Sequence, residues 1–229
     1  MNKTSLSLSV VAVLSALIAP LAGAVSPTPD EIAEARQWTA ARFEGTAETK
    51  APQLCFSFTF DGKPVGELLA VCQLKQGSRK LDDERTERTL TWTHPSTRLE
   101  VRCVSVEYAD FPVVEWTVYL RNTGTADTPL IENIQALDAG WERAGDSEFV
   151  LRGIKGDYCV PDSYAPYEMT LGPNATQKFA PEGGRPTNKE FPYYNLAMPG
   201  GGVILAVGWP GQWATSFTRD GDKGIQVVA

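Results

Sequence analysis

The chain has 229 residues, of which 42% are hydrophobic, and it contains 20 glycines and 16 prolines. This composition is typical of one turn-rich globular domain and excludes a disordered or collagen-like chain. Its 28 acidic residues outnumber 21 basic ones, giving a net charge of −7 at pH 7. Because an acidic surface repels phosphate groups, we expect neither nucleic acid nor an anionic lipid surface as a partner.

Residues 1–24 have the layout of a secretory signal peptide. A positive charge at Lys3 precedes an apolar run from Leu6 to Leu21, and Ala22-Gly23-Ala24 supplies the small residues of a cleavage site. The run is short for a membrane anchor, although an uncleaved anchor remains the alternative. We therefore expect export to the periplasm or the extracellular space, with no membrane contact after cleavage.

Residues 25–52 are predicted to form one short helix and a linker. Thr28 is a helix cap, Pro29 occupies the first helical position, and Glu31 completes a capping box. One helical face then carries apolar side chains, namely Ile32, Ala35, Trp38 and Ala41. Gly45 is expected to end the helix, and the linker ends at Pro52.

Residues 53–229 show the two-residue periodicity of β-strands. Strands are predicted in "CFSFTFDGKP", which turns at Asp61-Gly62, in "RTLTWTHP", in "LEVRCVSVEY" with a register slip at a bulge, in "VVEWTVYLRNTG", and from Leu130 to Leu137. Further strands are predicted near Phe149, Met169, Tyr193, Val203 and Phe217. No helical crossovers separate them, so the pattern predicts an all-β fold, a large antiparallel β-sandwich preceded by one short N-terminal helix.

Two segments are interpreted from their local composition, one rich in charges and one rich in glycine. The charged stretch from Gln73 to Arg88 is expected to be a solvated loop. Gly200-Gly201-Gly202 is followed by a β-branched run instead of a helix, so a hairpin is favoured over a phosphate-binding loop.

The potential metal-ligating and catalytic residues give no recognisable site. The four cysteines, Cys55, Cys72, Cys103 and Cys159, could form two disulfides or remain buried thiols. There is one histidine, His94, and no zinc-ligand spacing, so we expect no metal and no cofactor. Acidic residues are frequent, but none has a spacing that marks an acid–base pair, and we assign no catalytic residue.

Six quoted segments, in their order along the chain, carry a family resemblance. They are "ARQWTAARFEG", "FSFTFDGKPVGELL", "TLTWTHPSTRLEVRC", "FPVVEWTVYLRNTGTADTPLIENIQALD", "GGRPTNKEFPYYNL" and "GGGVILAVGWPGQWATSFTRD". Together they resemble the N-terminal β-supersandwich domain of bacterial α-galactosidase-like enzymes, glycoside hydrolase family 36 and its relatives. The resemblance implies a following (β/α)8 barrel that carries the two catalytic aspartates of a retaining mechanism.

The same resemblance suggests where a functional surface lies. The sandwich of such enzymes packs on the barrel, and some of its loops approach the sugar pocket. Arg185, Asn188, Trp209 and Trp213 are the residues we expect to face carbohydrate or barrel, although the sequence pattern alone favours burial of both tryptophans in the core or in a domain contact. The expected partners are an α-galactoside, bound through the parent enzyme, and the chain's own barrel.

Two other functions stay open at this stage. The chain could be a stand-alone carbohydrate-binding module, or a structural or adhesion sandwich with its tryptophans buried. The chain stops at Ala229, before any barrel, so we expect the sandwich to be truncated there. We also expect the strand from Ile225 to Val228 to leave an uncovered edge that favours self-association.

Overall fold

The structure, a computed structural model, describes residues 25–44 and 52–229. The predicted signal peptide and the predicted helix stop at Gly45 lie outside these ranges. Helix α1 spans Pro29–Phe43, and its capping box is present, because Thr28 and Glu31 each accept the other's backbone N–H. A second helix, α2 (Val65–Ala70), was not expected. Neither helix has the length and hydrophobicity that a membrane-spanning helix requires.

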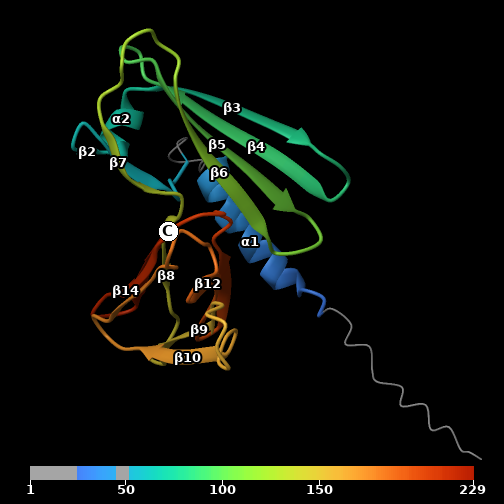
Figure 1. Ribbon diagram of the computed structural model, residues 1–229. Helices are drawn as coiled ribbons and strands as arrows, with labels where there is room; N and C mark the ends of the chain where they lie inside the picture. The colour runs from blue at the N-terminus through green and yellow to red at the C-terminus, as the bar shows by residue number, and fades with distance from the viewer. Residues whose placement is uncertain (1–24, 45–51) are drawn as a thin grey trace, which may run out of the picture.

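The strands of the described residues form four antiparallel sheets, which confirms the all-β sandwich. The first half of the chain supplies β1 (Ser57–Phe60), β2 (Lys63–Pro64), β3 (Gln73–Lys80), β4 (Arg85–Thr93), β5 (Leu99–Tyr108), β6 (Val114–Asn122) and β7 (Ile131–Gln135). They form the sheets β2-β1-β7 and β3-β4-β5-β6, which enclose one hydrophobic core together with α1 and α2. We call this half the first sandwich; it lies at the top of Figure 1.

The second half of the chain builds the second sandwich, at the bottom of Figure 1. Its strands are β8 (Asp138–Glu142), β9 (Phe149–Lys155), β10 (Pro166–Leu171), β11 (Thr176–Phe179), β12 (Glu190–Met198), β13 (Gly201–Ala206), β14 (Thr215–Arg219) and β15 (Gly224–Val228). The sheets β10-β9-β12-β13 and β11-β14-β15-β8 bury a second core, which is centred on Phe149, Leu196, Phe217 and Val227. The predicted glycine hairpin is confirmed as the β12–β13 connection.

Three tryptophans join the two cores. Trp38 of α1 stacks on Trp141 of β8, with ring centroids 6.4 Å apart and an interplanar angle of 2°. The same ring lies 5.8 Å from Trp116 of β6, and the Arg42 guanidinium lies 3.9 Å from its centroid. Since Trp116 packs on the first core and Trp141 on the second, α1 connects both sandwiches through one side chain.

Three expectations from the sequence are wrong in detail. Gln73 to Arg88 is not a loop, because β3 and the start of β4 form a regular hairpin there. Its side chains are mostly exposed, so the apolar alternation that marks a strand is missing. The β5 register has no bulge: Ser105 occupies the buried position, and Val104 and Val106 lie on the opposite face.

The third correction concerns the strand at Ile225 to Val228. This strand is β15, and it lies between β14 and β8, so neither of its edges is free. The segment "DAGWE" of β8 has a glycine and two acidic residues and gave no strand signal in the sequence. The self-association argument based on this edge therefore fails.

All four cysteines are free thiols, which resolves the alternative left open by the sequence. Cys55 and Cys103 are buried in the first core, whereas Cys159 is exposed. Burial raises the pKa of the Cys55 thiol to about 12, which keeps it protonated and unreactive near neutral pH.

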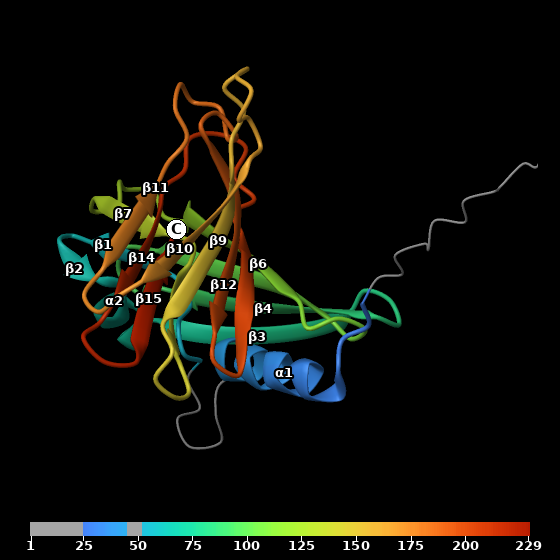
Figure 2. The same ribbon diagram turned by 90° about the horizontal axis from the view of Figure 1, so that it is seen from below.

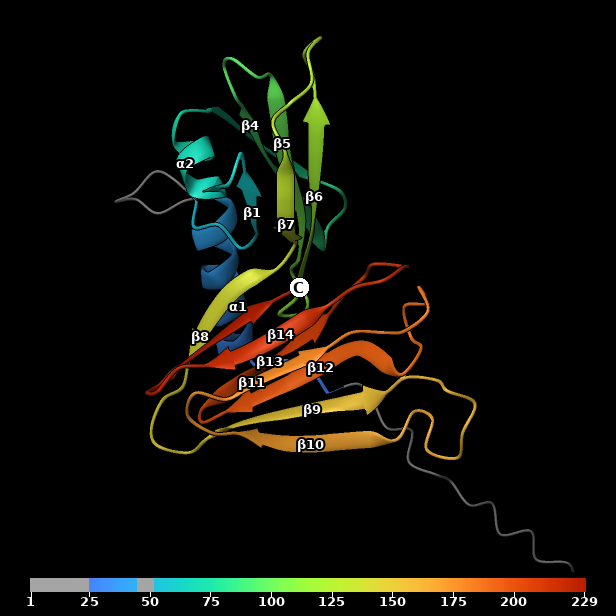
Figure 3. The same cartoon turned by 60° about the vertical axis from the view of Figure 1, so that its left-hand side comes forward.

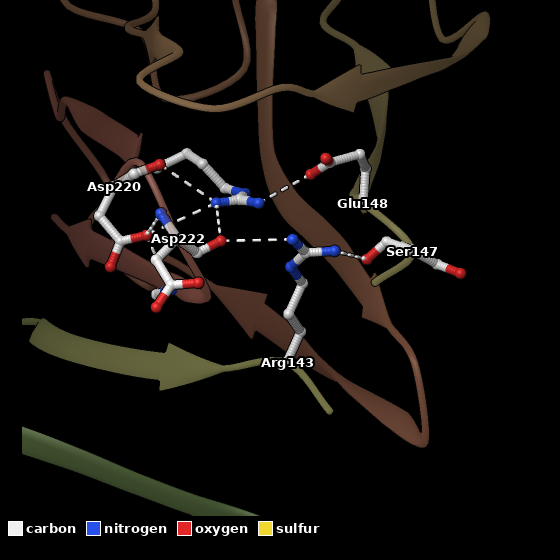
Figure 4. Close-up of polar contacts among 7 residues, drawn as sticks. Arg143, Ser147, Glu148, Asp220 and Asp222 are labelled. Carbon is white, nitrogen blue, oxygen red and sulfur yellow. Dashed lines mark hydrogen bonds and ion pairs between the residues drawn. The ribbon is translucent and has the colours of Figure 1, made fainter. Parts of the chain in front are cut away.

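A buried arginine fixes the β14–β15 turn. The Arg219 side chain is fully buried and lies next to the ring of Phe149. Its guanidinium donates to the backbone carbonyls of Asp220 and Asp222 and, at 2.8 Å, to the Glu148 carboxylate. Arg143 donates to Ser147 and Asp222 from the other side, so both arginines join the turn to residues 143–148 (Figure 4).

We expect Trp38→Ala to lower the free energy of unfolding by about 2–3 kcal/mol, because it removes an aromatic group shared by both cores. The matched control is Trp209→Ala, since Trp209 is 63% exposed and its loss should cost less than about 0.5 kcal/mol. Urea unfolding followed by circular dichroism measures both. Equal effects of the two substitutions would contradict the role given to Trp38.

Replacing Arg219 with methionine should cost about 3–5 kcal/mol, since Glu148 and two carbonyls lose their donor while an apolar chain fills the space. Glu148→Gln keeps an acceptor for the guanidinium and should cost about 1 kcal/mol. Urea midpoints and slopes separate the two variants. An Arg219→Met protein within about 1 kcal/mol of wild type would show that packing alone holds the turn.

Candidate functional site

Three loops meet at one end of the second sandwich. They are residues 156–165 between β9 and β10, residues 180–189 between β11 and β12, and residues 207–214 between β13 and β14. We call them the loop cluster. They lie at the top of Figure 2 and at the right-hand end of the sheets in Figure 3. Connections at one end of a sandwich are the usual place for binding groups, because the sheets hold them in fixed positions.

Backbone hydrogen bonds tie the first two loops together. The amide of Gly156 donates to the carbonyl of Lys189, and the amide of Asp157 donates to the carbonyl of Thr187. Both hydrogen bonds are 2.8 Å long. A Cβ added to Gly156 would lie 2.2 Å from the Thr187 carbonyl oxygen, so only glycine permits this close approach.

The second and third loops are joined by two side chains. Gln212 accepts from the amide of Gly184 and donates to the carbonyl of Pro181. The indole Nε1 of Trp213 donates to the carbonyl of Pro186 at 2.7 Å. The three loops are therefore one bonded unit instead of three independent segments.

A charged network lies on the surface of this unit. Glu182 accepts from the ammonium group of Lys189 at 2.6 Å and from the hydroxyl of Tyr158. These hydrogen bonds hold the pKa of the Glu182 carboxyl below its usual range and raise the pKa of Tyr158 above its own. Glu182 is therefore an ionised anchor at neutral pH and is unsuited to act as a general acid there.

The backbone of the cluster contains uncommon conformations. Cys159, Tyr164 and Lys189 have φ values of 56°, 63° and 74°, in the left-handed region that such side chains rarely adopt. Gly183 and Gly184 also have positive φ. Residues held in this way cluster at binding sites, where the surrounding contacts enforce a particular surface shape.

Exposed aromatic rings give the surface its chemical character. Tyr158, Tyr164 and Trp209 are about half exposed or more, and Tyr164 packs edge-on against Phe191. The indole of Trp209 lies over Gly211. A Cβ added to that glycine would lie 3.1 Å from the indole Nε1. Rigid exposed rings among hydroxyl, amide and carboxylate groups suit ligands that combine C–H faces with hydroxyl groups.

Two buried tyrosine hydroxyls without a protein partner belong to the same end of the sandwich. Tyr167 and Tyr194 both lie opposite Gly153 in the strand register, near the loop ends of β9, β10 and β12. Neither hydroxyl has a hydrogen-bond partner within the described residues. Burial raises the pKa of both tyrosines and that of the nearby Glu190.

The four residues singled out in the sequence lie on two of these loops, but they differ in exposure. Arg185 is exposed, and its side chain has no partner among the residues described. Asn188 is half-buried and donates to the carbonyl of Glu182, which shapes its own loop. Trp209 faces solvent, whereas Trp213 is a core residue that is only 6% exposed. The burial of Trp213 matches the core alternative left open in the sequence, and its indole N–H positions the loop around Pro186.

Sequence reasoning missed Tyr158, Tyr164 and Gln212. The segment "DYCVPDSYAPY" contains three tyrosines and two prolines, a composition that could have indicated a rigid aromatic loop. Gln212 gave no signal in the sequence, because its partners, the Pro181 carbonyl and the Gly184 amide, lie about 30 residues away in the chain.

Several carboxylates have structural partners. Asp162 pairs with Lys155, Asp157 accepts from the amide of Cys159, and Asp82 pairs with Arg85. Glu107 pairs with Arg88. Within the described ranges no cluster of three or more His, Cys, Asp or Glu side chains is arranged to hold a metal ion.

Neither family models nor curated proteins match the sequence, but solved structures match the fold. The galactosidase domain of the α-galactosidase–sucrose kinase AgaSK matches with a TM-score of 0.56 and 15% identity, over 78% of this chain and 26% of that one.

Two structures of variants of the GH36 α-galactosidase AgaA from Geobacillus stearothermophilus also match. The complex with raffinose gives a TM-score of 0.54 at 10% identity, over 81% of this chain and 27% of the other. The complex with 1-deoxygalactonojirimycin gives 0.55 at 13% identity, over 90% and 30%. At these identities the likeness shows the fold alone, and the chain spans between a quarter and a third of each matched protein.

Proposed function

We propose that this chain is a non-catalytic β-supersandwich domain of an exported α-galactosidase-like glycoside hydrolase. In this proposal it packs on a (β/α)8 barrel, and the loop cluster forms part of the wall of the sugar pocket. The observation that carries the proposal is the fold match over 78%, 81% and 90% of the chain, in each case to an α-galactosidase or to the galactosidase domain of a larger enzyme.

The chemistry of the loop cluster supports this function. Trp209 and Tyr164 offer exposed aromatic faces that can stack against the C–H face of a sugar ring or pack on a second domain. Arg185 adds up to five N–H donors with no partner among the described residues, which suits hydroxyl oxygens or barrel carbonyls. The bonded frame keeps these groups in place before anything binds, which lowers the entropic cost of recognition.

A carbohydrate-binding module is the second candidate, because the 63% exposure of Trp209 would serve that function as well. The two candidates differ in where hydrolysis occurs. A domain of a hydrolase alters the rate at a barrel, whereas a binding module alters only the attachment of the protein to a polysaccharide.

The chain on its own should not hydrolyse aryl α-galactosides. Several of its carboxylates are engaged in ion pairs, among them Asp82, Glu107 and Asp162, and the retaining mechanism needs two carboxyl groups about 5–5.5 Å apart across the scissile bond. Release of p-nitrophenol from p-nitrophenyl α-galactoside measures this. Turnover that persists after removal of host enzymes would overturn the assignment of a non-catalytic domain.

The loop cluster should affect hydrolysis in the longer protein. We would extend the reading frame beyond codon 229, express the product, and compare Arg185→Ala and Trp209→Ala with wild type. Each substitution should lower kcat/KM about tenfold, equivalent to about 1.4 kcal/mol of transition-state stabilisation.

Phe111→Ala is the matched control, because Phe111 is another exposed ring but lies on the first sandwich, in the β5–β6 turn. It should leave kcat/KM unchanged. A reading frame that encodes no barrel would contradict the proposed function, as would an active enzyme that is insensitive to both loop substitutions.

A further inference from the structure

A pocket of about 220 Å³ opens on the first sandwich, beside α2. It lies between the β1–β2 turn, the helix and the turn that joins β4 to β5. In Figure 3, α2 is at the upper left and the loop cluster at the lower right, so the two regions lie at opposite ends of the molecule. The function proposed above makes no use of this pocket.

The pocket has an apolar floor. Phe60 and Leu68 are buried members of the first core, and Val71, which is 59% exposed, contributes an apolar side. An apolar floor beneath a polar rim is the usual construction of a site for a small ligand that has both kinds of surface.

The rim carries three charged side chains, those of Asp61, Lys63 and Glu67. All three are exposed, and none of them forms an ion pair within the ranges that the structure describes. Asp61 has a φ of 52° in the β1–β2 turn, so the hairpin geometry fixes the position of its backbone.

His94, the chain's single histidine, completes the rim. The backbone amide of Thr97 donates to its Nδ1 at 3.2 Å, and the Thr97 hydroxyl lies 2.9 Å from the same atom. Because Nδ1 accepts, the neutral imidazole carries its proton on Nε2. Nε2 has no hydrogen-bond partner among the described residues, so its N–H is available to a ligand.

The balance of these groups selects the class of ligand. Two carboxylates oppose an anion, whereas the Lys63 ammonium and the imidazole N–H oppose a cation. A neutral molecule whose hydroxyls both donate and accept satisfies all four groups, and its C–H surface suits the apolar floor.

The volume of the pocket lies below the ~300–1,000 Å³ of pockets for drug-sized ligands, which limits the occupant to about one ring. We propose that this pocket binds a single neutral pyranose unit, as a second carbohydrate site distinct from the loop cluster.

The single histidine makes the test specific to this pocket. We would label the chain with 13C and 15N and titrate it with methyl α-D-galactopyranoside or methyl β-D-glucopyranoside. At least one of them should shift the His94 ring signals saturably, with half-saturation at about 1–10 mM, the range expected for one small ligand. Sodium galacturonate should bind at least fivefold more weakly than the better glycoside, because its carboxylate faces Asp61 and Glu67.

Asp61→Asn removes the charge without disturbing the turn, since asparagine tolerates positive φ at least as well as aspartate. It should weaken binding about fivefold or more, and Asp146→Asn, the same substitution at an exposed site in the second sandwich, should have no effect. If the His94 ring signals did not shift at up to about 100 mM of either glycoside, the proposed binding site would be contradicted. Equal affinity of the two variants would contradict it as well.

The outcome is separate from that of the hydrolase proposal, because the titration needs no catalysis. Shifts confined to the loop cluster would overturn the pocket and leave the hydrolase proposal standing. Saturable His94 shifts would support the pocket even if the extended protein hydrolysed no α-galactoside.

Discussion

The contact of Trp38 with Trp116 and Trp141 determines how the two sandwiches are arranged. Each sandwich has its own core, and few other groups connect them. Among these, Trp116 donates from its Nε1 to the carbonyl of Ala136, and the amide of Asp138 donates to the carbonyl of Cys55. Because Trp38 belongs to neither sheet, α1 acts as a brace whose ring contacts β6 and β8.

The loop cluster illustrates how a sandwich can present a shaped surface on connections that lack regular structure. Carbonyl groups of Pro181, Pro186 and Thr187 accept bonds from the neighbouring loops, so prolines stiffen the chain and also serve as acceptors. The left-handed conformations at Cys159 and Tyr164 lie beside local hydrogen bonds, in which the amide of Cys159 donates to the Asp157 carboxylate and the amide of Ala165 donates to the carbonyl of Asp162. The matched α-galactosidases show that this fold occurs as a part of larger hydrolases, whereas the use of the loops in this chain is our proposal.

Much of the fold could be predicted from the sequence, because local signals agreed with the tertiary structure. The capping box at Thr28 specified the start of α1, and alternation around Leu90 and Val101 specified β4 and β5. The hairpin from Gln73 to Arg88 could not be predicted this way, because both of its faces meet water and its strands are paired by charges such as Arg79 and Glu87. Sequence periodicity reflects which side chains are buried, and few side chains of that hairpin are buried.

The candidate sites were less predictable for a related reason. Trp209 and Trp213 flank the same Pro-Gly turn, and Trp213 turns inward because it packs on Tyr194 in the second core and donates to the carbonyl of Pro186 from another loop. The rim of the pocket beside α2 combines Asp61 of the β1–β2 turn with His94 of the turn that joins β4 to β5, which belong to different local patterns. Sequence spacing does not indicate such contacts between distant residues, since they arise from the packing of one sheet on another.

The position of α1 has a consequence for the order of folding. This helix comes before every strand in the chain, yet the tryptophans on which it docks belong to β6 and β8, which are made much later. A 15-residue helix is marginally stable in isolation, and most of its stability must come from tertiary packing. The Trp38 face therefore remains without its binding surface until both sandwiches have begun to form. Closure of the brace should be a late event that converts two loosely connected halves into one cooperative body.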